Sequence, residues 1–258
     1  MRARESQTFM SIYYEPNAVE VATGDAGTDG SIPWKADSRL LGQVSTPPAI
    51  AALMAKWVMS TNPPSVIDPA AGLGGLLTAC RALNPRSALV GVERDLPTLQ
   101  RAKTLAPRNT KLIVADYLKS DVGQFGGVIA NPPYVKAHRL DYVESDWRYF
   151  EELLGTPLDR LTNLYALFLL KIWNDLALHG RAAVILPAEF LNANFGEEIK
   201  ERLLKSVRPV AVAVFDPSVN LFSNALTTSA IIFLEKKLTP NGSPLLGKRL
   251  QSVEAAEE

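Results

Sequence analysis

The feature that most constrains the fold of this chain is an alternation of short apolar runs with longer amphipathic segments. The apolar runs are rich in β-branched residues, which is typical of strands buried on both faces. The segments between them repeat their apolar residues at helical spacing. Strands separated by helices run parallel, so we predict an α/β fold with a doubly wound, mostly parallel sheet. The predicted strands are residues 65–68, 88–93, 111–116, 126–131, 181–187, 210–216 and 226–237, and the predicted helices are residues 49–60, 96–105, 161–178 and 196–207, with a further helix that ends at residue 83.

The composition is that of a soluble globular domain. The chain has 258 residues, of which 47% are hydrophobic and 21% are charged, enough for a sizeable core. The longest apolar region, residues 161–180, is interrupted by Lys171, Asn174 and Asp175, so it predicts a buried helix rather than a membrane span. The first residues lack the apolar run of a signal peptide. We therefore expect a cytoplasmic protein without a membrane partner.

Charge and cysteine content exclude several classes of protein. Lys plus Arg number 27 and Asp plus Glu number 27, so any surface for nucleic acid must be local. A single cysteine, Cys80, excludes an intrachain disulfide and a cysteine metal cluster. Only two histidines are present, without carboxylates at ligand spacing, so we predict no metal site.

The pattern divides the chain into three parts. Residues 1–40 are irregular, and their stretch 24–33 is rich in glycine and aspartate and predicts a loop. Residues 41–237 carry the alternating pattern and form the domain that would hold a catalytic site. Residues 238–258 are expected to be a flexible C-terminal tail.

In an open α/β sheet, ligands bind beyond the carboxyl ends of the strands. The first predicted strand ends in Asp68-Pro-Ala-Ala-Gly72-Leu-Gly74-Gly75. Small residues let such a turn approach a ligand closely, and glycine permits a positive φ. The spacing is not G-x-G-x-x-G, so a dinucleotide fingerprint is not supported. Taken alone, this stretch is equally consistent with a tight strand–helix turn.

Acidic residues stand at the next two strand ends. Glu93 follows the second strand, where a carboxylate can accept hydrogen bonds from both hydroxyls of a ribose. Asp116 and Tyr117 follow the third, where they could contact the amino group and the face of an adenine. Each residue alone is equally consistent with a surface acid, a cap or a half-buried ring. Together they predict a pocket for an adenosine-containing cofactor without phosphate-binding lysines.

The fourth strand end carries the most specific motif, Asn131-Pro132-Pro133-Tyr134. Asn131 offers a carbonyl acceptor, and the prolines fix the backbone so that its carbonyls are held rigidly. Tyr134 offers a flat face. Two acceptors and a stacking ring match an exocyclic amine on a planar ring, although a proline-rich turn is the simpler interpretation of the motif by itself.

These two motifs resemble those of the S-adenosylmethionine-dependent amino-methyltransferases, and most closely the gamma-class DNA adenine-N6 methyltransferases of restriction–modification systems. The resemblance runs from about residue 42 to residue 236. Further matching segments are Gly42-Gln-Val-Ser-Thr46-Pro-Pro before the first strand, Asn163-Leu-Tyr165 at the start of a long apolar helix, residues 186–204 with the aromatic Phe195, and residues 221–236, which are similar to the family's antiparallel last strand.

The resemblance implies a class I methyltransferase with a seven-stranded sheet, an antiparallel last strand and no metal. It implies transfer of a methyl group from S-adenosylmethionine to the N6 amine of an adenine flipped out of DNA. It assigns catalysis to Asn131, Pro132, Pro133 and Tyr134, and stacking on the base to Tyr134 and Phe195. The cofactor-binding residues it implies are Thr46, Asp68, Ala70, Gly72, Glu93, Arg94, Asp116, Tyr117 and Asn131.

Two departures from the family leave alternatives open. Members usually continue into a target-recognition domain, whereas this sequence ends after the last strand, so a separate specificity subunit or recognition domain is an expected partner. Asp68 also stands where glutamate is common. The alternatives are glutamine-N5 methylation of a release factor, whose enzymes also use Asn-Pro-Pro-Tyr, RNA adenine-N6 methylation, and a non-catalytic subunit that retains the cofactor fold.

Overall fold

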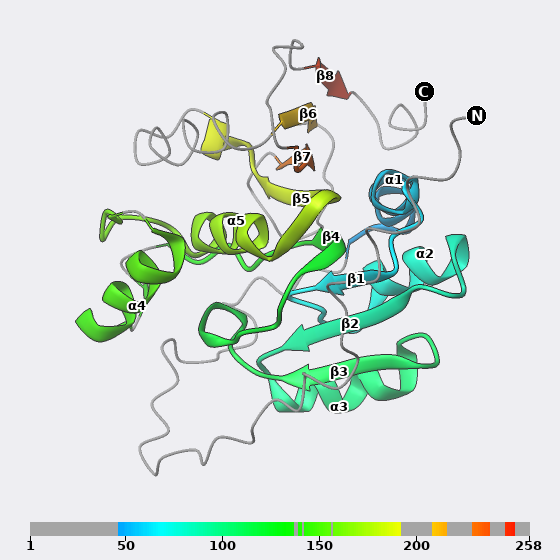
Figure 1. Cartoon of the computed structure of the whole chain (residues 1–258), viewed down its shortest axis with the longest axis horizontal. Helices are drawn as coiled ribbons and strands as arrows, with labels where there is room; N and C mark the ends of the chain where they lie inside the picture. The colour runs from blue at the N-terminus through cyan, green and yellow to red at the C-terminus, as the bar shows by residue number, and fades with distance from the viewer. Residues whose placement is uncertain are drawn as a thin grey trace. The chain divides into compact units, whose positions relative to one another are not determined.

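The computed structural model of the protein describes residues 46–136, 139–140, 142–155, 157–191, 208–215, 229–237 and 246–250 (Figure 1). The chain divides into two compact units, Met1–Ser31 and Ile32–Glu258, and all described residues belong to the second. Phe195 and the predicted helix 196–207 lie outside the described residues.

Helices and strands alternate along most of the described chain. The strands are β1 (Ser65–Asp68), β2 (Ala88–Glu93), β3 (Thr110–Val114), β4 (Phe125–Ala130), β5 (Leu176–Pro187), β6 (Arg208–Phe215), β7 (Ser229–Glu235) and β8 (Leu246–Leu250). The helices are α1 (Pro48–Met59), α2 (Gly75–Leu83), α3 (Leu96–Leu105), α4 (Glu144–Leu154) and α5 (Leu164–Asp175), with the short 3-10 helices η2 (Tyr117–Lys119) and η4 (Ala188–Leu191).

The strands form one sheet in the order β3-β2-β1-β4-β5-β7-β6-β8. β7 runs antiparallel to β5 and β6, and every other pair is parallel. The predicted doubly wound, mostly parallel sheet with an antiparallel strand is therefore confirmed. The sheet has an eighth strand, however, because β8 pairs with β6. β8 lies in the segment predicted to be a flexible tail, so that prediction is wrong for residues 246–250.

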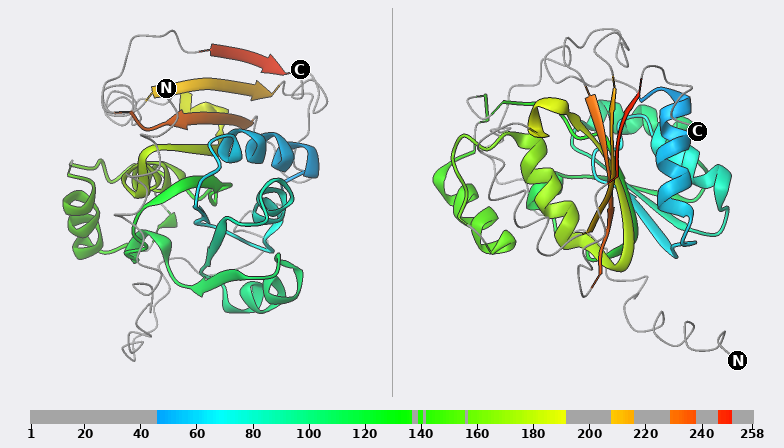
Figure 2. Two further views of the ribbon diagram at one scale, coloured as in Figure 1. Left: turned by 45° about the vertical axis from the view of Figure 1, so that its right-hand side comes forward. Right: turned by 90° about the horizontal axis from the view of Figure 1, so that it is seen from above.

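Helices cover both faces of the sheet (Figure 2). α1 and α2 pack against each other on one face, and α5 packs on β5 on the other face with α4 outside it. α5 is buried at all but one of its twelve positions, which agrees with its apolar sequence. Among the described residues, no helix is both long and apolar enough to cross a membrane.

α5 ends earlier than predicted. Residues 176–178 begin β5 instead of continuing the helix, and His179 takes a positive φ of 65°. The ammonium group of Lys236 donates hydrogen bonds to the main-chain carbonyls of Trp173, Asn174 and Leu176, at 3.0, 3.4 and 2.7 Å. A cation at this position satisfies carbonyls that a helix leaves unpaired at its C-terminus.

We expect Lys236→Met to lower the free energy of unfolding by about 1–2 kcal/mol, because the end of α5 loses a charged donor. The matched control is Lys237→Met, since Lys237 pairs with Glu235 at 3.0 Å rather than with the end of α5 in the described structure. Urea unfolding followed by circular dichroism measures both variants. Equal destabilisation by the two substitutions would contradict this role for Lys236.

Candidate active site

Several of the predicted site residues lie at one edge of the sheet because their strands are neighbours. β3, β2, β1 and β4 are adjacent and parallel, so their carboxyl ends share one edge. The register pairs Asp68 with Gly91 and Glu93 with Val114. The acids and the loop that begins at Asn131 therefore stand at a single edge, where a ligand binds in sheets of this kind.

The turn after β1 is shaped by glycine. Gly72 and Gly74 have positive φ values of 52° and 86°. A Cβ on Gly74 would also lie 3.0 Å from the Cβ of Ala106, so glycine is required there on two grounds. A Cβ on Gly72 would meet no atom within 4 Å. The backbone at Gly72 is thus exposed to open space, as expected of a turn that approaches a ligand.

Glu93 is buried and joins two loops. Its Oε2 accepts a hydrogen bond from the N–H of Gly72 at 3.0 Å, and its Oε1 accepts one from the N–H of Asp95 at 2.8 Å. Burial raises the pKa of Glu93, and these backbone donors oppose the rise. An ionised carboxylate has about four acceptor positions. The N–H of Arg94 is a third backbone donor near this carboxylate, and the acceptor capacity that remains is available to ribose hydroxyls.

Asp68 is more deeply buried, at 1% exposure. Its Oδ1 accepts a hydrogen bond from the N–H of Ala70 at 3.1 Å. Burial raises the pKa of Asp68 to about 7, the Ala70 N–H lowers it, and the negative charge of Glu93 raises it further. Two neighbouring buried carboxyls disfavour an anionic ligand at this edge and favour a cationic one.

Asp116 and Tyr117 follow β3, and their side chains lie in different surroundings. Asp116 caps η2 by accepting from the N–H of Leu118 at 3.1 Å, and its other oxygen accepts from the hydroxyl of Tyr142 at 3.3 Å. Burial raises the pKa of Asp116, and the charge of Arg94 is the main opposing influence. Asp116 and Arg94 thus lie close enough for their charges to interact.

Tyr117 lies in the core instead. It is 2% exposed, and its hydroxyl donates to Oδ2 of Asp175 at 2.7 Å. Its ring packs on Phe168 with centroids 5.3 Å apart. The prediction that this ring offers an open face to adenine is therefore wrong for this structure. The hydrogen bond to α5 instead fixes the segment that carries Asp116.

Asn131 follows β4 directly. Its Nδ2 donates to the Oγ1 of Thr46 at 3.3 Å, so the segment before α1 contacts the Asn131-Pro-Pro-Tyr134 loop. Pro132 is buried and Pro133 is half-buried. The loop thus has little freedom to move, because proline fixes the backbone and both ends are held.

The ring of Tyr134 is half-buried and packs edge-on against Tyr165, with centroids 6.3 Å apart and the planes at 77°. Tyr165 packs edge-on against Phe190 in turn, at 6.1 Å. The N–H of Leu164 donates to the carbonyl of Val135 at 3.0 Å. The start of α5 therefore supports the loop. Sequence reasoning noticed this helix start but did not assign Tyr165 to the site.

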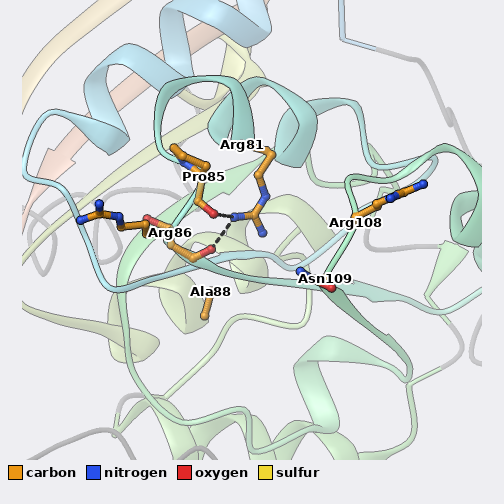
Figure 3. Close-up of a pocket in the computed structure, with 7 residues that line it drawn as sticks. Arg81, Pro85, Arg86, Ala88, Arg108 and Asn109 are labelled. Carbon is orange, nitrogen blue, oxygen red and sulfur yellow. Dashed lines mark hydrogen bonds between the residues drawn. The ribbon is translucent and has the colours of Figure 1, made fainter.

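Elsewhere, the structure shows a cavity of about 400 Å³ at the opposite edge of the sheet, where β2 and β3 begin (Figure 3). Arg81 points into it and donates to the carbonyls of Pro85 and Ser87 at 2.6 and 3.0 Å. This arginine braces the turn between α2 and β2, and the cavity lies away from the acids and the Asn131 loop. Among the described residues, no three His, Cys, Asp or Glu side chains are grouped so as to hold a metal ion.

The sheet order, the antiparallel β7 and the loops at the carboxyl edge define a class I S-adenosylmethionine-dependent methyltransferase fold. Residues 35–246 match the model of the N-6 DNA Methylase family, and the chain belongs to that family.

Two curated relatives and one solved structure illustrate the similarity. The type II methyltransferase M.AccI of Acinetobacter calcoaceticus is 36% identical over 194 residues, which are 74% of this chain and 36% of that protein. The type II methyltransferase M.XamI of Xanthomonas campestris pv. amaranthicola is 30% identical over 203 residues, 74% of this chain and 38% of that protein. A type I restriction-modification system methyltransferase subunit from Streptococcus thermophilus superposes with a TM-score of 0.62 at 23% identity, over 75% of this chain and 45% of that chain. The chain spans less than half the length of each of these three proteins.

The burial of Asp68 gives a prediction with a defined pH dependence. Its pKa is raised from 3.8 to about 7 on folding, so the unfolded chain ionises first as the pH rises. As the pH rises from 3.8 to about 7, the buried charge lowers the free energy of unfolding by a growing amount. This cost is fully present at pH 8. We expect Asp68→Asn to raise the free energy of unfolding at pH 8 by on the order of 1–3 kcal/mol, and this advantage to shrink toward pH 4.

Urea unfolding of wild type and variant across this pH range measures the difference. Glu152→Gln, at an exposed position on α4, is the control and should show no such trend. A difference that is independent of pH would show that the charge of Asp68 carries no cost in the folded protein.

Proposed function

We propose that this chain binds S-adenosylmethionine at the carboxyl edge of the sheet and transfers its methyl group to the N6 amine of adenine in DNA. The observation that carries the proposal is the Asn131-Pro-Pro-Tyr134 loop, which follows β4 at the same edge as Asp68 and Glu93. The family supports the substrate class, because the chain belongs to the N-6 DNA Methylase family.

The residues at the edge suit this cofactor. Glu93 would hold the ribose hydroxyls, and the backbone at Gly72 would lie against the cofactor because the turn is open there. Asp116, braced by Tyr142, would accept from the adenine amino group. Asp68 supplies negative charge beside a ligand that carries a sulfonium and an ammonium group. Because such a ligand carries no phosphate group, its binding at this edge requires no phosphate-binding lysines.

The target amine would be held by Asn131 and the rigid carbonyl of Pro132. The Nδ2 of Asn131 donates to Thr46, which orients the amide so that its Oδ1 is the acceptor end. Two acceptors on one amine draw its lone pair out of conjugation with the ring and direct it at the methyl carbon. S-adenosylmethionine supplies an electrophilic methyl group, and the protein contributes orientation and fixed dipoles.

Tyr134 would stack on the adenine, which must leave the duplex to reach the loop. Phe195 would contribute the second stacking face, as the resemblance implies. We assign sequence specificity to a separate subunit or target-recognition domain. This assignment is supported by the balance of 27 basic and 27 acidic residues, which restricts any surface for nucleic acid to a local patch. The activity would then serve a restriction–modification or related DNA-modification system.

The test is transfer of labelled methyl from S-adenosylmethionine to separate pools of duplex DNA, RNA and cellular protein, with the modified unit identified by mass spectrometry. We expect N6-methyladenine in DNA. Asn131→Ala should lower the rate by at least ~100-fold, because the amine loses one of its two oriented acceptors. The affinity for the cofactor, measured by calorimetry, should change much less.

Glu93→Gln is the complementary variant. It should weaken cofactor binding, because an amide cannot accept hydrogen bonds at all the positions that a carboxylate offers. Label found in RNA or in glutamine would be compatible with the proposed cofactor pocket but would overturn the assignment of DNA as the substrate. No label in any pool, with cofactor bound, would overturn the proposal that the chain alone catalyses transfer.

A further inference from the structure

The hydroxyl of Tyr134 is not needed for stacking, since a phenylalanine ring has the same face. In this structure the hydroxyl oxygen is fully buried, although the ring is only half-buried. It forms no hydrogen bond of acceptable geometry within the described structure. An unsatisfied buried hydroxyl is costly, so its presence at the centre of the site calls for a function.

Ser229 is the matching group. It is 2% exposed and its hydroxyl also forms no hydrogen bond of acceptable geometry. β7 is antiparallel, so its first residue lies at the carboxyl edge, where Ser229 pairs in register with Pro187 at the end of β5. The hydroxyl is close enough to Tyr134 to influence the phenol by hydrogen bonding.

Burial keeps the phenol protonated by raising the pKa of Tyr134. Each hydroxyl can therefore donate to or accept from the other. The two buried hydroxyls are therefore close neighbours whose contact lacks the geometry of a completed hydrogen bond.

We propose that Ser229 is a positioning residue for Tyr134, and that the hydrogen bond between their hydroxyls closes when adenine docks on the ring. This inference rests on the proposed function. Formation of this hydrogen bond satisfies two buried hydroxyls at once and fixes the plane of the Tyr134 ring. Part of the stabilisation of the flipped base therefore comes from the hydrogen bond between Tyr134 and Ser229. The start of β7, about a hundred residues further along the chain, thereby becomes part of the target-base site.

The test uses Tyr134→Phe, Ser229→Ala and the double variant in the full chain. Because neither hydroxyl is satisfied without substrate, each single variant should keep or raise the unfolding midpoint. Each should lower kcat/KM for DNA by about 5- to 10-fold, through a less well positioned ring. The double variant should be no worse than the singles, because both act through one contact. Calorimetry should show cofactor affinity unchanged.

Ser87→Ala is the matched control. Ser87 is equally buried, but its hydroxyl donates to the carbonyl of Pro63 at 2.7 Å, at the opposite edge of the sheet. Removing a satisfied hydroxyl should lower the unfolding midpoint and leave methyl transfer unchanged. The control and the test variants should therefore show opposite patterns.

Full DNA activity of Ser229→Ala, or additive losses in the double variant, would overturn the inference while wild-type transfer upheld the proposed function. Loss of stability and of cofactor binding in both single variants would assign the pair a structural role and also overturn it. A wild-type chain that transfers no methyl group would overturn the proposed function and, with it, this inference.

Discussion

One carboxylate, that of Glu93, holds together the two turns on which the candidate site depends. It accepts from Gly72 in the turn after β1 and from Asp95 in the turn after β2. The N–H of Ala71 also donates to the carbonyl of Val92 at 2.9 Å, so the turns are joined at two points. Without this carboxylate, two backbone donors would lose their partner, which costs more than the bonds contribute. The group that would bind the ribose is therefore also the group that shapes its pocket.

α5 gives the same kind of support to the other two loops. Its first turn contacts the loop after β4 through Leu164 and Tyr165. Its last turn holds the segment after β3, where Lys171 pairs with Asp175 at 2.9 Å and Asp175 accepts from Tyr117. Breaking a buried ion pair is far more destabilising than its formation is stabilising. A single buried helix thus fixes both the segment of Asp116 and the loop of Asn131 relative to the sheet.

The parts that sequence reasoning predicted are those in which local pattern and tertiary packing agree. The buried parallel strands and the clustering of acids at their ends follow from periodicity and from the geometry of parallel sheets. The boundary between α5 and β5 could not be predicted, because residues 176–178 continue an apolar run that does not distinguish helix from strand. β8 is short and has Gly247, Lys248 and Arg249 between two leucines, so its pairing with β6 rather than its local sequence makes it a strand. The core position of Tyr117 depends on Asp175, a long-range partner that the local sequence does not reveal.

Charge, more than fold, decides which ligand this sheet edge accepts. A dinucleotide would bring a pyrophosphate to the turn after β1, and there it would meet Asp68 and Glu93, two buried carboxyls whose pKa values are raised by burial. The charge of the pyrophosphate would add to the electrostatic repulsion that already acts between the two acids. A ligand with positive charge reverses the sign of that interaction and stabilises the ionised form of Asp68. The same two acids whose burial opposes folding would therefore favour the cationic cofactor that we propose for this edge.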